Sequence, residues 1–347
     1  MKPDLSILIC TRNGIRTIAE AISCCEKEIL SCGQNVEIIV VDNGSTDGTY
    51  EHVLSRLLYT KVTLRLYREQ KPGKIYAFEL GVKESRSDLV SIIDDDNFIE
   101  TNFISLSTKF FNSYKNLGII GSLNQLDEQV NPPDWFEWAR GSFACSSPFI
   151  KDNIINDVDG RIIGDVGYVP GAGTTFRKKP LLDALSKGYK FYNDFQRGNN
   201  MVVAGEDMEM CWLYWSMGFR FGYDSRIRMR HSISPKRLSI NEYNKLLSSI
   251  GAGFLGVDPF YYTSRLIRMN RIKLTWQWQL FAKIKQLVLL HATKEHGKFS
   301  IKHRLFRIKS QRIRILGAIK RILKERNNYS NHIRLVNEGS WTELRVR

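Results

Sequence analysis

The sequence LVSIIDDD at residues 89–96 joins a short apolar run to three consecutive aspartates. An apolar run of this length predicts a buried strand, so Asp94, Asp95 and Asp96 would follow its carboxyl end. Open α/β sheets bind their ligands at that edge. Carboxylates this close together repel one another, and a divalent cation or protonation relieves the repulsion. Their oxygen atoms suit Mg²⁺ or Mn²⁺, whereas the alternative is a solvated acidic turn after a strand.

Strand-like and helix-like segments alternate through the first 125 residues. The predicted strands cover residues 5–10, 36–41, 62–67, 89–93 and 119–123, and the predicted helices cover 17–30, 46–57 and 74–84. Repeated βα units predict a mostly parallel α/β sheet with helices on both faces. The sequence TRNG at residues 11–14 stands where the glycine fingerprint of a dinucleotide fold would lie, and a Walker lysine loop is absent. Any nucleotide bound here must therefore be held by other residues.

A second cluster of polar residues lies further along the chain. The sequence GED at residues 205–207 opens a predicted helix, after the glycine-rich bend PGAG at residues 170–173. Two short strands are predicted at residues 219–223 and 227–230, and His231 follows the second. These segments belong to a large body that we place at residues 1–258.

Cysteine use and hydropathy indicate the cellular compartment. The six cysteines show neither zinc-ligand spacing nor a secreted disulfide framework, which favours a reducing cytosol. The first ten residues resemble a strand rather than a signal peptide. No stretch reaches the roughly 18 uncharged apolar residues that a membrane span needs. We therefore expect a cytoplasmic protein.

Positive charge is concentrated in the carboxyl-terminal quarter. The formal net charge is +15, and residues 259–347 contain 21 Lys and Arg but 4 Asp and Glu. Residues 1–258 contain 30 and 32 of these respectively, so the body is almost neutral. This asymmetry predicts a separate basic, mainly helical region at residues 259–347. Its expected partner is a polyanionic surface, either nucleic acid or anionic lipid.

A basic amphipathic helix is predicted at residues 300–326. Its apolar stripe consists of Ile301, Leu305, Ile308, Ile315, Ile319 and Ile322. Such a helix is typical of a membrane-surface element, and Trp276, Trp278 and Phe281 could anchor it. A helix packed on its own domain is the alternative. Nucleic acid is disfavoured because the aromatic residues are not interleaved with the basic ones, so we expect a peripheral protein on the inner face of the cell membrane.

Four separate motifs, in this order, resemble those of the family 2 glycosyltransferases. They are SILICTRN at residues 6–13, VVDNGSTDGT at 40–49, DDD at 94–96 and GED at 205–207. The similarity covers roughly residues 4–235, and the order of the motifs makes it specific. The resemblance implies the GT-A fold, with a Rossmann-like sheet flanked by helices, and an inverting sugar transfer. Residues 1–258 would be the glycosyltransferase domain, with a nucleotide-binding half at about 1–125 and an acceptor half at about 126–258.

The resemblance also implies a set of residues that hold the nucleotide-sugar donor. They are Thr11, Asn13, Asp42, Lys74, Asp94 and Asp95. Asp42 can accept hydrogen bonds from a uracil N–H or from sugar hydroxyls, and Lys74 can donate to the phosphates. The residues after Asp42 are typical of turns, so a structural turn is the alternative there. A surface lysine is the alternative for Lys74.

A metal site follows from the same resemblance. Asp94 and Asp96 match the DxD signature, in which Asp96 would bind Mn²⁺ or Mg²⁺ directly. Asp95 would approach the donor sugar or its ribose. His231 resembles the late histidine that completes the metal coordination in some relatives, although a lone histidine is more often structural.

A catalytic base is implied by the last motif. Glu206 and Asp207 match the family's ED pair, whose aspartate removes the proton of the acceptor hydroxyl. The alternative is structural, because acidic residues in the first turn of a helix stabilise its dipole.

Together these features predict a metal-dependent inverting glycosyltransferase of the hexosyltransferase type. It would move one sugar from a nucleotide-sugar, favoured as a UDP-sugar, to a hydroxyl of a glycan or lipid-linked acceptor in cell-surface polysaccharide biosynthesis. The QxxRW signature of processive relatives is absent from the sequence, which favours single additions. A nucleotidyltransferase acting on a sugar phosphate is the alternative enzyme, and it would release pyrophosphate. The non-enzymatic alternative is a nucleic-acid-binding protein that uses the basic region.

Overall fold

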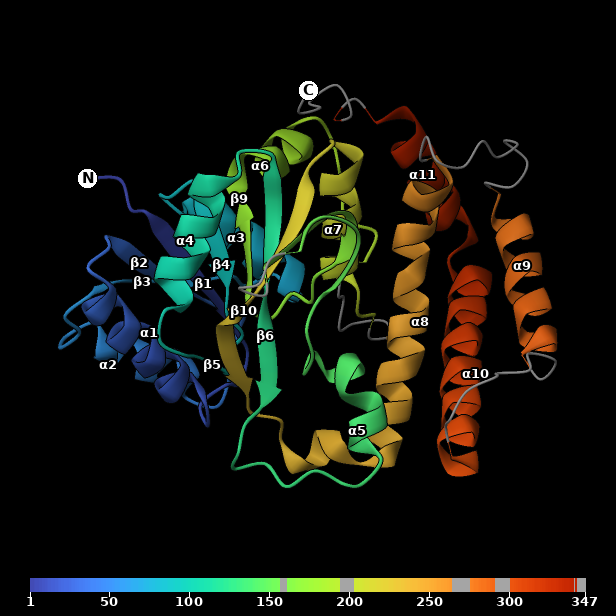
Figure 1. The fold of residues 1–347 in the computed structure, drawn as a ribbon, viewed down its shortest axis with the longest axis horizontal. Helices are drawn as coiled ribbons and strands as arrows, with labels where there is room; N and C mark the ends of the chain where they lie inside the picture. Colours follow the sequence, from blue (N-terminus) through green and yellow to red (C-terminus); the bar gives the residue numbers. More distant parts are fainter. Residues whose placement is uncertain (157–160, 194–202, 264–274, 291–299, 340, 342–347) are drawn as a thin grey trace.

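A ten-stranded sheet forms the centre of the computed structural model, which describes residues 1–156, 161–193, 203–263, 275–290, 300–339 and 341 (Figure 1). The strands are β1 (Leu5–Thr11), β2 (Val36–Asp42), β3 (Thr63–Arg68), β4 (Leu89–Ile92), β5 (Asn97–Ile99), β6 (Leu117–Leu126), β7 (Phe149–Asn156), β8 (Arg161–Tyr168), β9 (Thr174–Arg177) and β10 (Arg220–His231). The helices beside the sheet are α1 (Ile18–Cys32), α2 (Thr49–Arg56), α3 (Lys74–Glu84), α4 (Phe103–Ser113), α5 (Phe136–Ala139), α6 (Lys178–Ser186) and α7 (Glu206–Ser216), with the 3-10 helices η1 (Arg140–Phe143) and η2 (Pro235–Leu238). The later helices are α8 (Ile240–Thr263), α9 (Trp276–Leu289), α10 (Ile301–Lys324) and α11 (Arg326–Glu338).

The strand order is β3-β2-β1-β4-β9-β6-β10-β8-β7, and β5 pairs with β10. Strands β1 to β4 are parallel to one another, as are β6 and β10. Strand β9 lies antiparallel between β4 and β6, and β8 is antiparallel to β10. The predicted fold class, a mostly parallel α/β sheet flanked by helices, is confirmed.

Alternation of side chains along the buried strands builds one core on each face of the sheet. Leu8 and Ile39 pack with Phe78 of α3 on one face. Ile7 and Val40 pack on the other face, where α1, α2 and α4 cover the sheet. Because both faces are covered, β1 and β2 are buried along almost their whole length, which is why the sequence showed mostly apolar runs rather than alternation.

One prediction about the strands was wrong. The two short strands expected at residues 219–223 and 227–230 are a single strand, β10, with an irregularity between Tyr223 and Arg228. The polar residues at that irregularity resemble a turn in the sequence. Pairing with β6 on one side carries the strand through them.

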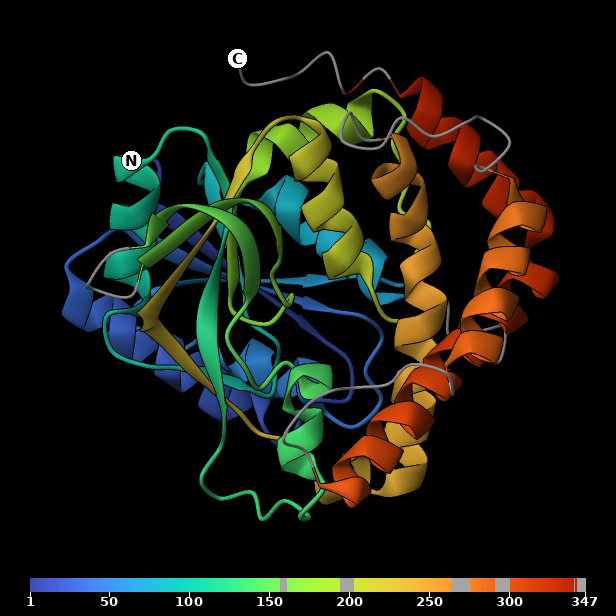
Figure 2. The ribbon, with the colours of Figure 1, turned by 45° about the vertical axis from the view of Figure 1, so that its right-hand side comes forward.

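The carboxyl-terminal helices form a layer beside the sheet (Figures 1 and 2). Helix α8 packs on α7, α10 packs on α8, and α9 lies outside α10. Helix α8 continues through residue 258, where we had placed the end of the main domain, and contains Pro259. In the described part of the chain, no helix has the length and apolar character that crossing a membrane requires.

Two glycines let α8 and α10 approach closely. A Cβ atom on Gly251 would lie 1.9 Å from the carbonyl oxygen of Arg314, and one on Gly317 would lie 2.2 Å from that of Ser248. Side chains of both helices are buried at this contact, including Leu255 and Ile322. Part of the region predicted to be separate is therefore packed against the body of the protein.

Candidate active site

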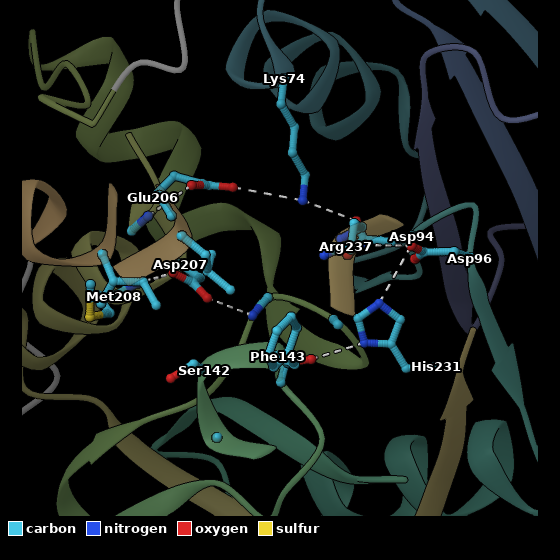
Figure 3. A pocket seen from close by; sticks show the side chains of 18 of the residues that line it. Lys74, Asp94, Asp96, Ser142, Phe143, Glu206, Asp207, Met208, His231 and Arg237 are labelled. Atoms are coloured by element: carbon cyan, nitrogen blue, oxygen red, sulfur yellow. Dashed lines mark hydrogen bonds and ion pairs between the residues drawn. The ribbon is translucent and has the colours of Figure 1, made fainter. Parts of the chain in front are cut away.

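A cavity of about 810 Å³ opens where the carboxyl ends of β1 and β4 meet the first turns of α3 and α7. Residues Asp94 to Asp96 line it, as do Glu206 and Asp207 (Figure 3). The register of the sheet explains this arrangement. Leu8 of β1 pairs with Ile92 of β4, so both strands end at the same edge. The two acidic motifs, more than a hundred residues apart in the sequence, share one cavity.

Asp94, Asp95 and Asp96, which we call the acidic trio, contact cationic and hydroxyl side chains from other elements. The Nζ atom of Lys74 lies 3.0 Å from an Asp94 carboxylate oxygen, and it lies 3.7 Å from Glu206 on its other side. The hydroxyl of Thr11 donates a hydrogen bond to Asp95. Burial and the neighbouring charges of Asp96 and Asp94 raise the pKa of Asp95 to about 6. The repulsion expected from the sequence is therefore present.

His231 reaches the trio through strand pairing. Strand β5 begins directly after Asp96 and pairs with the end of β10, where His231 faces Asn97. The Nε2 atom of His231 lies 3.4 Å from Asp96 Oδ2, and Arg237 Nη1 lies 2.9 Å from the same oxygen (Figure 3). Burial alone would raise the pKa of Asp96, but His231 and Arg237 outweigh it and lower this pKa to about 2.

The residues predicted as metal ligands, Asp94, Asp96 and His231, thus line one cavity. In the described part of the chain no three acidic, histidine or cysteine side chains converge closely enough to count as a metal cluster. The orientation of His231 nevertheless suits a ligand. Its Nδ1 atom lies 3.0 Å from the carbonyl oxygen of Phe143, to which it can only donate, and this directs Nε2 toward Asp96. The donor set that these three residues offer, two carboxylates and an imidazole nitrogen, is one that Mg²⁺ or Mn²⁺ accepts.

The two acids of the ED pair have different surroundings. Asp207 Oδ2 accepts hydrogen bonds from the Gly171 amide at 2.9 Å and from the Tyr168 hydroxyl at 3.0 Å. Its Oδ1 accepts one from the Met208 amide at 2.8 Å. Glu206 instead faces Lys74, and burial raises the pKa of Glu206. The Asp207 carboxylate is therefore fixed in orientation, whereas Glu206 pairs with the lysine that also holds Asp94.

The predicted donor-binding residues divide into two groups. Thr11, Lys74, Asp94 and Asp95 line the cavity. Asp42 and Asn13 are not among its lining residues, and Asn13 accepts a hydrogen bond from the Thr46 amide at 2.9 Å.

Asp42 is nevertheless suited to a ligand. It is fully buried, and its Oδ2 accepts a hydrogen bond from the Ser45 amide at 3.1 Å. Its Oδ1 is buried without a hydrogen-bond partner among the described residues. An orphaned acceptor of this kind fits a donor group of a ligand, such as a base N–H.

Several lining residues were not predicted, among them three arginines and a tyrosine. Arg12 follows Thr11 directly, and its position at a strand end could have been noticed. Tyr168 precedes the PGAG bend, and Arg237 lies in η2 six residues after His231. Arg314 comes from α10, where the sequence shows it as one of many basic residues. No local pattern separates it from them.

Comparison with known proteins agrees with this geometry. Residues 6–144 match the family model described as Glycosyl transferase family 2. The glycosyltransferase GlyG of Streptococcus pneumoniae serotype 4 is 25% identical over 176 residues, which is 49% of this chain and 56% of that protein. An uncharacterized glycosyltransferase of Rickettsia felis is 27% identical over 106 residues, which is 30% of this chain and 17% of that protein. The chain therefore spans about half of the first relative and a smaller part of the second.

A solved structure shares the fold. The mannosyltransferase PcManGT from Pyrobaculum calidifontis, in complex with GDP-Man and Mn²⁺, superposes with a TM-score of 0.59. The match covers 94% of this chain and 88% of that one at 15% sequence identity. The overall architecture of the sheet and its helices is therefore of the GT-A type.

We predict that the His231–Asp96 pair makes a pH-dependent contribution to stability in protein treated with EDTA. Burial alone would lower the pKa of His231, but Asp96 raises it from 6.5 to about 10. The pair is therefore fully stabilising between about pH 3.8 and pH 6.5, and this contribution is lost as the pH rises toward 10. At the acid end it is lost as the pH falls from 3.8 toward 2, the range over which Asp96 titrates. His231→Gln should lower the free energy of unfolding at pH 6 by on the order of 3 kcal/mol.

Urea denaturation of both proteins between pH 5 and pH 9.5 checks this prediction. The difference between wild type and His231→Gln should narrow steadily above pH 6.5. His52→Gln on α2 is the control and should show no such trend. A difference for His231→Gln that stays constant up to pH 9.5 would mean that the histidine is neutral in the folded protein.

Proposed function

The chain belongs to glycosyltransferase family 2 and has the GT-A fold, and on this premise we propose that it is a metal-dependent inverting glycosyltransferase. It moves a single sugar from a nucleotide-sugar, favoured as a UDP-sugar, to a hydroxyl of a glycan or lipid-linked acceptor. The observation that carries the proposal is the shared cavity. The acidic trio, Lys74 and Asp207 all line this cavity, and hydrogen bonds fix the carboxylate of Asp207.

The donor end of the cavity is formed by residues around β1, β2 and β4. Asp42 directly precedes the lining residue Asn43, and its Oδ1, which has no partner among the described residues, accepts a hydrogen bond from the nucleoside. Lys74 contacts the phosphates. Asp94, Asp96 and His231 would hold Mn²⁺ or Mg²⁺. When bound, such a cation neutralises the charge of the departing nucleoside diphosphate. The complex of PcManGT with GDP-Man and Mn²⁺ supports a donor and metal of these classes.

Asp207 acts as the catalytic base in this proposal. Its Oδ2 already accepts two hydrogen bonds, while Oδ1 accepts one, from Met208. A carboxylate oxygen has two lone pairs, so Oδ1 retains one for the acceptor hydroxyl. Asp207 takes the proton as that hydroxyl oxygen attacks the anomeric carbon opposite the leaving group. Glu206 serves beside it by holding Lys74.

Exposed apolar residues support attachment to a membrane surface. On α9, Phe281 is 63% exposed and Val288 is 70% exposed, with Ile284 between them on the same face. At the start of α10, Ile301 is 79% exposed. We propose that these residues enter the interface of an anionic cytoplasmic leaflet, to which the basic side chains of residues 259–347 are attracted.

The stripe predicted on α10 divides in two. Ile315 and Ile322 are buried, with Ile322 against α8. Ile301 and Leu305 remain exposed. Of the predicted anchors, Trp276 packs against the buried cluster formed by α8, α10 and α11, whereas Phe281 is exposed. Packing on the protein and contact with a membrane therefore use different parts of the same helices.

Asp207→Asn should abolish transfer while donor binding is retained. The amide cannot take a proton, so kcat should fall by roughly 10² to 10⁴. The Kd for UDP with Mn²⁺, measured by calorimetry, should change less than about threefold, because Asp207 does not contact the nucleotide in this proposal. Turnover is followed as release of nucleoside diphosphate with a panel of nucleotide-sugars. Loss of donor binding in this variant would show that its role has been assigned wrongly, and release of pyrophosphate would indicate a nucleotidyltransferase.

Asp96→Asn should remove metal-dependent donor binding. The change takes a negative oxygen from the proposed cation site, so the enhancement of UDP binding by Mn²⁺ should fall at least about tenfold. Asp134→Asn, an exposed position, is the control and should bind like wild type. Equal stimulation by Mn²⁺ in Asp96→Asn and wild type would place the cation elsewhere.

Flotation with liposomes tests the membrane proposal in the full-length chain. Truncation at residue 258 is unsuitable because it cuts α8 and uncovers the face on which α10 packs. The double variant Phe281→Ser, Val288→Ser should float at least about fivefold less with vesicles rich in phosphatidylserine. Leu58→Ser, at a residue that is 88% exposed beyond α2, is the matched control and should float like wild type. Equal flotation of all three proteins would contradict insertion through α9.

A further inference from the structure

The cavity extends beyond the donor end along α8. Four residues of that helix line it, Leu246, Ile250, Phe254 and Val257. Their spacing places them on one face of the helix. Trp138 and Trp212 line the same cavity. This part of the site therefore offers an apolar wall, unlike the acidic and cationic donor end.

Arg314 is the cation of this apolar part, and among the described residues it is the one lining residue that comes from 259–347. Its Nη2 atom donates a hydrogen bond to Ser142 at 2.9 Å. Its Nε atom is buried without a hydrogen-bond partner in the described structure. None of the ion pairs formed by the described residues includes it, whereas Lys74 and Arg237 each have a carboxylate.

A half-buried guanidinium without a counter-ion is unfavourable, because burial removes hydration that no partner replaces. Burial accordingly lowers the pKa of Arg314. The close packing of Gly251 against the Arg314 backbone fixes the position of this residue. An anion from outside the chain would complete its environment.

The position of Arg314 relates it to the acceptor rather than to the donor. Arg314 donates to Ser142, and Tyr168, whose hydroxyl donates to Asp207, lines the same cavity. Arg12, a second lining guanidinium outside the ion pairs of the described residues, lies instead at the end of β1 next to Thr11, which contacts the acidic trio. The two guanidiniums therefore suit two different ligands, with Arg12 at the donor end.

We propose that the acceptor carries an oxyanion, a phosphate or a carboxylate, which Arg314 binds while an apolar portion of the acceptor lies along α8. The guanidinium fork fits either group in a bidentate manner. This inference rests on the proposed function, because it assigns the acceptor class of the same site. It makes Arg314 a specificity-determining residue, supplied by a helix outside the region of family resemblance.

Calorimetry with small amphiphiles tests the assignment in the full-length protein. Octyl phosphate, octanoate and octyl β-glucoside are titrated below their micellar concentrations, with and without saturating UDP and Mn²⁺. Wild type should bind at least one of the two anionic probes at least tenfold more tightly than the glucoside, and the tighter one identifies phosphate or carboxylate. Arg314→Gln should lose that tenfold preference. Arg314→Lys, which keeps the charge but not the fork, should retain part of it.

Matched measurements separate this inference from the proposed function. Arg312→Gln, at an exposed residue of the same helix, should bind all probes like wild type. UDP binding should be unchanged in Arg314→Gln, whose folding is checked by circular dichroism. No preference for an anionic probe in wild type, or an unchanged preference in Arg314→Gln, would overturn the inference. Loss of UDP binding in a folded Arg314→Gln variant would also overturn the inference, because it would place Arg314 in the donor site. If the wild-type protein binds no nucleotide, that result would count against the proposed function alone.

Discussion

Repulsion among carboxylates at the end of β4 is the constraint around which the site is organised. Asp94, Asp95 and Asp96 are held close together by a buried strand that cannot move away. Positive side chains from distant elements reduce this repulsion. Lys74 of α3 pairs with Asp94, and Arg237 of η2 pairs with Asp96. In the proposed function, a divalent cation and a diphosphate would take the place of these protein charges.

The mixed sheet places residues from later in the chain, including Gly171 and His231, beside the acidic motifs. Strand β9 enters antiparallel between β4 and β6, so the PGAG bend before it lies over the ends of the parallel strands. Its Gly171 amide then meets Asp207. Strand β10 continues past an irregularity and pairs with β5, which sets His231 against Asp96.

The carboxyl-terminal helices link the site to the surface. Helix α8 supplies an apolar wall of the cavity on one side and the packing surface for α10 on the other. Helix α10 in turn sends Arg314 into the cavity, while its first turns and α9 keep apolar residues exposed. The same region therefore shapes one side of the cavity, and in our proposals it contacts both the acceptor and a membrane surface.

The sequence by itself determined the fold class, because strand periodicity is a local signal, and its resemblance to the family 2 glycosyltransferases indicated most of the acidic residues that line the cavity. Most of the predicted site residues line one cavity, namely Thr11, Lys74, the acidic trio, Glu206, Asp207 and His231. Only the tertiary structure decided how Glu206 and Asp207 differ, that β10 is continuous, and that Arg314 enters the cavity. Those outcomes depend on which groups meet across the sheet and between α8 and α10. Contacts between residues far apart in the chain leave no pattern in either segment alone, and a single arginine on a basic helix looks like its neighbours until packing selects it.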